Sequence, residues 1–215
     1  MLDGPRVPPA SGAKPKSLVV FLHGYGADGN DLIGIGREWA RDLPHTAFAS
    51  PNAGQRCAGA PNGRQWFPLT MRDPHEFARG AAAAEPAINE FLDAELDRYG
   101  LDDGALALVG FSQGTMMALH VGPARKRRIA GILGYSGLLA DPTALTGASV
   151  QTPPVMLIHG ERDDLIPVAA IFSAAQGLAG ARIPVEWHIS PGIGHGIGPD
   201  GIELGLGFLR QVFRR

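Results

Sequence analysis

The sequence lacks the features that commit a chain to disulfides, zinc, nucleic acid or a bilayer. Its one cysteine, Cys57, excludes an internal disulfide and a cysteine-based zinc site, and no signature of a reactive thiol surrounds it. The charges nearly balance, with 19 Lys and Arg against 21 Asp and Glu, so there is no overall attraction to nucleic acid. Long apolar runs are also missing, because "LVVFL" at residues 18–22 is too short to span a membrane.

The N-terminal stretch, "MLDGPRVPPASGAKPKS", holds no apolar segment of the kind that a signal peptide needs. We therefore expect a cytoplasmic protein with no stable membrane insertion and no nucleic-acid partner. The basic stretch "ARKRR" at residues 124–128 fits a solvated helix end, where cations complement the helix dipole. We expect residues 1–16 to form a Pro-rich arm and residues 17–215 to form one domain.

The sequence is rich in glycine, with 30 residues, and in short apolar runs that alternate with helical patterns. Strand-like runs are predicted at residues 18–22, 46–49, 105–109, 129–133, 155–158 and 185–189. Helices are predicted at residues 31–42, 77–99, 112–125, 168–178 and 201–213. Because helices separate most of the strands, the pattern predicts an α/β fold with a mostly parallel sheet covered by helices on both faces.

Two long segments fit neither element. Residues 51–75 are rich in Pro and Gly and contain two aromatic side chains, and residues 138–154 form a second such stretch. Loops of this length in a compact domain are usually functional or disordered. The aromatic residues favour a folded lid over the first segment.

The sequence "GFSQG" at residues 110–114 matches G-x-S-x-G, with a predicted strand before it and a predicted helix after it. Such an abrupt strand-to-helix turn exposes the hydroxyl of its serine, here Ser112. A Cβ two residues to either side would collide with neighbouring backbone, which explains the two flanking glycines. The pattern predicts that Ser112 is a nucleophile.

A serine nucleophile needs a base, and in this architecture an acid and then a histidine follow it in the chain. His195 lies in "GIGHGI", between the last predicted strand and helix, and is the best candidate for the base. The acid is expected after the strand at residues 155–158, where Glu161, Asp163 and Asp164 follow. Spacing does not decide between the two aspartates, and Asp141 beside Pro142 fits a turn.

The glycines of "HGYGADG", residues 23–29, spell the G-x-G-x-x-G pattern of dinucleotide-binding loops. Such loops also require a carboxylate near the end of the second strand, but that strand ends "AFASPN". A triad hydrolase instead needs a backbone N–H from this first loop, aimed at the oxyanion that forms during acyl transfer. The glycines therefore favour an oxyanion hole over NAD binding.

Five ordered motifs, "FLHGYGADGNDL", "RQWFPL", "GFSQGTMMAL", "HGERDDLIP" and "GIGHGI", make the chain from about residue 17 onward resemble the phospholipase/carboxylesterase family of α/β-hydrolases. This family includes small bacterial carboxylesterases and acyl-protein thioesterases. The resemblance implies an α/β-hydrolase catalytic domain with Ser112 as nucleophile and His195 as base. It also assigns the acid to Asp163.

The resemblance further implies that the backbone N–H groups of Tyr25 and Gln113 form the oxyanion hole. It makes Trp66 and Phe67 of "RQWFPL" candidates for contact with substrate. The expected activity is hydrolysis of small to medium acyl esters, with no metal and no cofactor. An acyl-protein thioesterase or lysophospholipase with the same triad, a ligand-binding protein without turnover, and a homodimer stay open.

Overall fold

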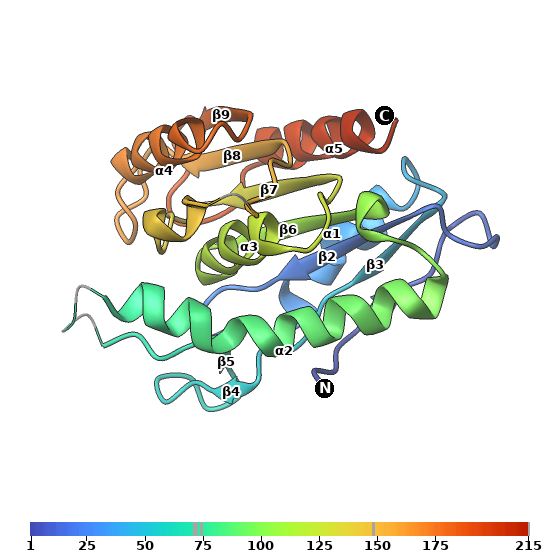
Figure 1. Cartoon of the computed structure of the whole chain (residues 1–215), viewed down its shortest axis with the longest axis horizontal. Coiled ribbons are helices and arrows are strands. Elements are labelled where there is room, and N and C mark those ends of the chain that lie inside the picture. Colours follow the sequence, from blue (N-terminus) through green and yellow to red (C-terminus); the bar gives the residue numbers. More distant parts are fainter. Residues whose placement is uncertain (71–72, 74, 148, 215) are drawn as a thin grey trace.

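A computed structural model describes residues 1–70, 73, 75–147 and 149–214, which form a seven-stranded sheet with helices on both faces (Figure 1). The strand order is β1-β3-β2-β6-β7-β8-β9, and a separate hairpin pairs β4 with β5. The strands are β1 (Arg6–Val7), β2 (Ser17–Leu22), β3 (Thr46–Ala49), β4 (Gln55–Arg56), β5 (Arg64–Gln65), β6 (Leu106–Phe111), β7 (Gly131–Tyr135), β8 (Val155–Gly160) and β9 (Val185–Ser190).

The helices are α1 (Asn30–Trp39), α2 (Glu76–Tyr99), α3 (Gln113–Ala124), α4 (Ala169–Gly180) and α5 (Pro199–Phe213). Two short 3-10 turns, η1 (Asp103–Ala105) and η2 (Pro142–Leu145), complete the regular structure of the described residues. All predicted strands and helices are present, with ends that differ by no more than three residues. The predicted α/β fold is confirmed.

In the sheet order from β3 to β9, neighbouring strands pair in parallel. Parallel pairing needs a crossover between consecutive strands, and an α-helix lies in each of these crossovers except the one from β7 to β8, which contains η2. Side chains along a buried strand alternate between the two faces of the sheet. In β2, Leu18 and Val20 pack toward α2, α3 and α4, whereas Val19 and Phe21 pack toward α1 and α5. Helices on both faces therefore explain why β2 is apolar at almost every position.

Residues 6–7, within the predicted N-terminal arm, form β1 at the edge of the sheet. β1 pairs antiparallel with β3, and the Arg6 guanidinium donates to the buried carboxylate of Glu95 at 2.7 Å. Part of the predicted arm is thus integral to the sheet. The strand was missed because two residues are too few to show an alternating pattern.

The segment at residues 51–75 is more regular than the sequence predicts. It contains the hairpin β4–β5, and Trp66 and Phe67 are buried in the core on the α2 side of the sheet. The lid prediction also covers Met71, Arg72 and Pro74, which lie outside the described residues. The second long segment, residues 138–154, contains η2, and its Ala148 also lies outside the described residues.

Candidate active site

The loops that carry the candidate catalytic side chains meet at one edge of the sheet. β6, β8 and β9 belong to the parallel part of the sheet, so their carboxyl ends open on the same side. Ser112 directly follows β6, Asp163 lies three residues after β8, and His195 lies between β9 and α5. The strand order therefore brings these three distant residues to a common edge.

Ser112 occupies the sharp turn that joins β6 to α3. Its φ of 53° and ψ of −115° lie in a backbone region that residues other than glycine rarely adopt. Such a conformation persists only where the surrounding structure imposes it. A Cβ on Gly114 would lie 1.8 Å from the Leu22 carbonyl oxygen, and one on Gly110 would lie 2.4 Å from the Gly114 carbonyl oxygen. The structure confirms the predicted reason for both glycines of G-x-S-x-G.

Asp163 and His195 are hydrogen-bonded to each other. Asp163 Oδ2 lies 2.8 Å from His195 Nδ1, and Oδ1 accepts the backbone N–H groups of Leu165 at 3.0 Å and Ile166 at 2.8 Å. Burial by itself would raise the pKa of the Asp163 carboxyl. The Ile166 N–H and the His195 imidazole outweigh burial and hold that pKa below its ordinary value. The carboxylate is therefore ionised at neutral pH and can fix the His195 tautomer.

A second histidine, His159 at the end of β8, also contacts Asp163. His159 Nε2 lies 2.8 Å from the Ile166 carbonyl oxygen and 3.3 Å from Asp163 Oδ2, and its side chain is buried. Because a carbonyl oxygen only accepts, Nε2 carries the proton. One sequence signal points to this histidine: the His–Gly dipeptide at the end of β8 repeats the one that directly follows β2.

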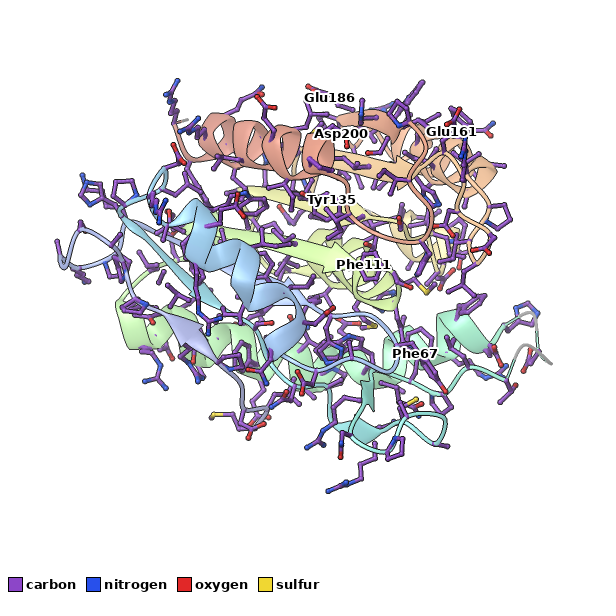
Figure 2. The ribbon with its side chains drawn as sticks, turned by 180° about the vertical axis from the view of Figure 1, so that it is seen from behind. Phe67, Phe111, Tyr135, Glu161, Glu186 and Asp200 are labelled. Carbon is purple, nitrogen blue, oxygen red and sulfur yellow. The ribbon has the colours of Figure 1, made fainter. Side chains whose placement is uncertain are left out.

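The imidazole of His195 lies beside the turn that holds Ser112. The Phe111 ring packs on it with a centroid separation of 5.0 Å, and Ser136 Oγ donates to the Gly196 carbonyl oxygen at 3.4 Å (Figure 2 labels Phe111 at the end of β6). Within the described residues, the Ser112 hydroxyl has no hydrogen-bond partner. Such a contact often tightens only when substrate binds.

The candidate oxyanion donors lie close to Ser112. A Cβ on Gly24 would lie 3.4 Å from the Ser112 Cβ, so the loop after β2 runs beside the serine. Among the residues that the structure describes, neither the Tyr25 nor the Gln113 N–H has an acceptor. The nearby Cys57 side chain raises the pKa of the Tyr25 phenol. Backbone hydrogen bonds of Gly26 and Ala27 with Arg64 link this loop to the segment at residues 51–67.

The structure does not place Trp66 and Phe67 at the surface of the site. Their side chains are 3% and 1% exposed, and the Trp66 indole N–H donates to the His23 carbonyl oxygen at 2.9 Å. Figure 2 labels Phe67 in the segment that follows β5. Nothing in their burial supports the expected contact with substrate: the Trp66 ring packs against His23, with ring centroids 5.2 Å apart, and the Phe67 ring packs against Phe77 of α2 at 6.5 Å.

The other candidate acids have separate roles. Asp141 Oδ1 accepts the Thr143 N–H at 2.9 Å and caps η2, which is the turn role that its sequence context predicts. Glu161 accepts the Gly192 N–H at 2.8 Å in the loop that leads to His195. Asp164 is exposed, next to the buried Asp163. Burial and the contact with His195 both favour Asp163.

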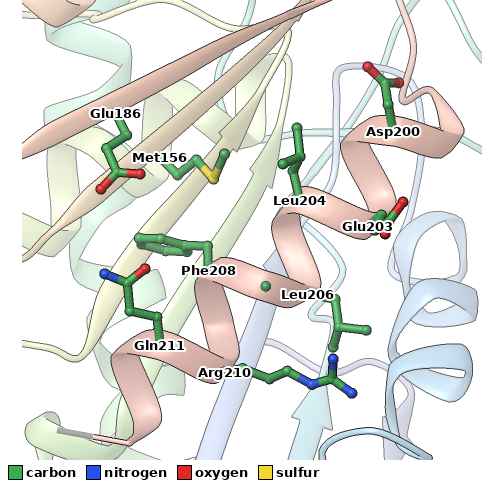
Figure 3. A pocket seen from close by; sticks show the side chains of 10 residues that line it. Met156, Glu186, Asp200, Glu203, Leu204, Leu206, Phe208, Arg210 and Gln211 are labelled. Atoms are coloured by element: carbon green, nitrogen blue, oxygen red, sulfur yellow. The ribbon is translucent and has the colours of Figure 1, made fainter.

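The cavity of about 660 Å³ in Figure 3 lies away from these residues. It opens between α5 and the β8–β9 edge, over Met156 and Phe208, with Glu186 and Gln211 at its rim. The residues that the structure describes include no group of three or more His, Cys, Asp or Glu side chains that could hold a metal ion. They also include no helix long and apolar enough to cross a membrane.

A strained serine between a central strand and a helix, with an acid and a histidine at the same sheet edge, defines the α/β-hydrolase class of serine hydrolases. The family model described as phospholipase/carboxylesterase matches residues 6–213, and the chain belongs to this family. The protein is therefore an enzyme of the serine-hydrolase type.

Similar proteins carry consistent names. The chain is 30% identical to acyl-protein thioesterase 1 of Gibberella zeae over 96% of this chain and 94% of that protein. It is 29% identical to esterase YpfH of Escherichia coli over 92% of this chain and 83% of that protein. The crystal structure of esterase PE8 superposes with a TM-score of 0.93 at 42% identity, covering 98% of this chain and 99% of that one.

Proposed function

We propose that this enzyme is a carboxylesterase that hydrolyses small to medium acyl esters through an acyl-enzyme intermediate. Ser112 is the nucleophile, His195 the general base and acid, and Asp163 the carboxylate that orients His195. The observation that carries the proposal is the 2.8 Å contact between Asp163 and His195 Nδ1 beside the strained turn of Ser112. This contact leaves His195 Nε2 as the nitrogen that receives the serine proton.

In the first half of the reaction, His195 Nε2 accepts the Ser112 proton while Oγ attacks the ester carbonyl carbon. The negative charge that forms on the carbonyl oxygen is held by the N–H groups of Tyr25 and Gln113. His195 then gives its proton to the departing alkoxide, which leaves as the alcohol. The acyl group stays on Ser112 as an ester.

In the second half, water takes the place of the alcohol. His195 accepts a proton from the water, the hydroxide attacks the acyl-enzyme carbonyl, and the same two N–H groups hold the oxyanion. The proton returns to Ser112 Oγ and the acid leaves. The cycle balances without a metal or an organic cofactor, because each proton that His195 takes up is released within the same half-reaction.

An acyl-protein thioesterase activity is the second candidate, favoured by the 30% identity to the Gibberella zeae enzyme of that name. The same residues serve it, because an oxyanion hole stabilises the carbonyl oxygen of esters and thioesters alike. Rates on matched oxygen-ester and thioester series of increasing acyl length separate the two activities. If kcat/KM is highest on short oxygen esters, the carboxylesterase proposal is supported. If kcat/KM is highest on long thioesters, the acyl-protein thioesterase activity takes its place.

The triad is tested with Ser112→Ala and with Ser173→Ala, which alters an exposed serine of α4. We expect the first variant to lower kcat/KM on a chromogenic ester by at least about 10⁴-fold and to lose labelling by a fluorophosphonate. The second variant should keep both. Full esterase rate in Ser112→Ala contradicts the proposal, and the absence of turnover of every ester and thioester by the unaltered enzyme favours a ligand-binding role.

A further inference from the structure

The side chain of Gln113 joins the start of α3 to the segment after β5. Its Oε1 accepts the Trp66 backbone N–H at 2.9 Å, and its Nε2 donates to the Phe67 carbonyl oxygen at 2.8 Å. The side chain is completely buried. Two hydrogen bonds from one planar amide to consecutive residues fix both the distance and the orientation of that segment, as a single bond would not.

The same segment also holds the loop after β2. The Trp66 indole N–H donates to the His23 carbonyl oxygen at 2.9 Å. Arg64, the first residue of β5, makes two backbone hydrogen bonds with this loop. Its carbonyl oxygen accepts the Gly26 N–H at 2.8 Å, and its N–H donates to the Ala27 carbonyl oxygen at 2.7 Å. Residues 64–67 therefore bridge the loop that carries the Tyr25 N–H and the helix start that carries the Gln113 N–H.

The His23 imidazole controls the peptide that contains the Tyr25 N–H. His23 Nδ1 lies 2.8 Å from the Gly24 carbonyl oxygen, and Nε2 lies 3.0 Å from the Ala53 backbone N–H. Because the Ala53 N–H must donate, Nε2 is an unprotonated acceptor and Nδ1 carries the proton. The imidazole is therefore neutral with one defined tautomer, and burial lowers the pKa of His23, which is consistent with this state.

The Gly24 carbonyl and the Tyr25 N–H belong to one planar trans peptide, so they point in opposite directions. A hydrogen bond that holds the carbonyl oxygen toward His23 therefore aims the Tyr25 N–H away from His23. The Ser112–Gln113 peptide is fixed in the same manner, because the Ser112 carbonyl oxygen accepts from Thr115 N–H at 3.0 Å. Each candidate oxyanion donor is thus aimed by what holds the carbonyl of its own peptide.

We propose that the buried side chains of His23, Trp66 and Gln113 form a neutral clamp that sets the direction and spacing of the two oxyanion N–H groups. This inference rests on the proposed function. The three are positioning residues, because their side chains act on the Tyr25 and Gln113 peptides. The clamp acts when the oxyanion forms, so its loss should lower kcat and leave KM nearly unchanged.

Two amide variants of His23 separate positioning from folding. In His23→Asn, the side-chain NH₂ can replace Nδ1 as donor to the Gly24 carbonyl, and the Ala53 N–H loses its acceptor. In His23→Gln, the longer side chain can accept from Ala53, and the Gly24 carbonyl loses its donor. Each variant gives up one buried hydrogen bond, so the two should lower the thermal unfolding midpoint by similar amounts.

We expect kcat to fall about 100-fold in His23→Gln and no more than about tenfold in His23→Asn, with KM changed less than about threefold in both, since a lost oxyanion donor costs this much. The affinity of a trifluoromethyl ketone, which forms a tetrahedral adduct on the serine, should weaken in parallel with kcat/KM. Trp66→Phe removes the indole N–H donor together with part of a buried ring, so it should lower both kcat and the unfolding midpoint, with KM unchanged.

Equal losses of kcat in the two His23 variants, or full kcat in His23→Gln together with a lowered unfolding midpoint, would overturn the inference. The Ser112→Ala control keeps this outcome distinct from failure of the proposed function. If that control is inactive while His23→Gln keeps full kcat, the nucleophile stands and the clamp does not. If the control is active, the assignment of the nucleophile itself is wrong.

Discussion

On the side of β2 and α3, the candidate site is bounded by neutral groups, a buried imidazole, an indole and an amide that all hydrogen-bond to backbone. On the side of β8 and β9 it is bounded by charge, with the Asp163 carboxylate between two imidazoles, His195 and His159. The first side would hold a transient oxyanion without changing its own charge. The second side would carry the protons.

The contrast is sharpest in two His–Gly dipeptides, of which one directly follows β2 and the other forms the last two residues of β8. His23 uses Nε2 as an acceptor for the Ala53 N–H, whereas His159 uses Nε2 as a donor to the Ile166 carbonyl. The same two residue types at these two strand ends thus use Nε2 in opposite hydrogen-bonding roles. The partner decides the role: the Ala53 N–H, after β3, makes Nε2 of His23 an acceptor, whereas the Ile166 carbonyl, after β8, makes Nε2 of His159 a donor.

Asp163→Asn removes the carboxylate charge on the side of β8 and β9. The amide oxygen can still accept from Leu165 and Ile166, but its NH₂ cannot accept the Nδ1 proton of His195, so the imidazole adopts the wrong tautomer. We expect kcat to fall about 10⁴-fold, with the unfolding midpoint lowered only slightly. Steady-state kinetics at neutral pH measure the effect.

The matched control is Asp164→Asn, which changes the exposed neighbouring carboxylate and should leave kcat unaltered. If both variants lose activity equally, the contact between Asp163 and His195 does not orient the base. If neither loses activity, the acid of the triad is a different residue. Either result would remove the charged side from the comparison.

The strand-to-helix turn at Ser112 lies between the two sides of the site, and it is tested with Gly114→Ala and Gly196→Ala. A Cβ on Gly114 would meet the Leu22 carbonyl oxygen at 1.8 Å, whereas nothing lies within 4 Å of a Cβ on Gly196. We expect the first variant to lose about 3 kcal/mol or more of unfolding free energy, because rigid backbone cannot yield to the added atom. The second should lose less than about 1 kcal/mol.

Urea denaturation of both variants measures this difference. Similar stability in the two would mean that the strand-to-helix turn at Ser112 yields easily, and the proposed strain on the serine would then lack a cause. A large loss confined to Gly114→Ala would support a turn fixed by backbone contact with β2. The oxyanion loop and the nucleophile would then be held at a common distance.

Local pattern was enough to predict the elements and Ser112, because alternation, helical period and flanking glycines act within a few residues. His195 and the region of the acid followed from chain order at the ends of strands. The choice of Asp163 over Asp164 needed the family resemblance, and the structure adds burial and contact with His195 as reasons. The proposed triad can in this sense be derived from the sequence and the family resemblance.

The clamp was not predictable, because it depends on which backbone atoms distant segments bring together. His23 and Ala53 are 30 positions apart, and Trp66 and Gln113 are 47 apart. The family resemblance makes Trp66 a candidate for contact with substrate, but only packing shows that its indole N–H donates to the His23 carbonyl. The paired His–Gly dipeptides were the one available signal.

The smallest expected effect concerns acid, because the two sides should lose stability in different pH ranges. Burial lowers the pKa of His23 below its ordinary 6.5. As the pH falls below 6.5, His23 therefore becomes protonated in the unfolded chain while it stays neutral in the native state. Native stability is therefore lost on acidification, by at most about 1.4 kcal/mol per pH unit for one group. The loss levels off below the native pKa.

Asp163 follows the same sign in a lower range. Its pKa is held below the ordinary 3.8, so its contribution is complete above that value and is lost as the pH falls through the native pKa. Urea denaturation between pH 7 and pH 3 should therefore show a shallower slope just below pH 6.5 in His23→Asn, and a shallower slope below pH 3.8 in Asp163→Asn. If His23→Asn keeps the native slope just below pH 6.5, the imidazole of His23 takes up a proton freely in the folded protein, and the oxyanion side is not neutral.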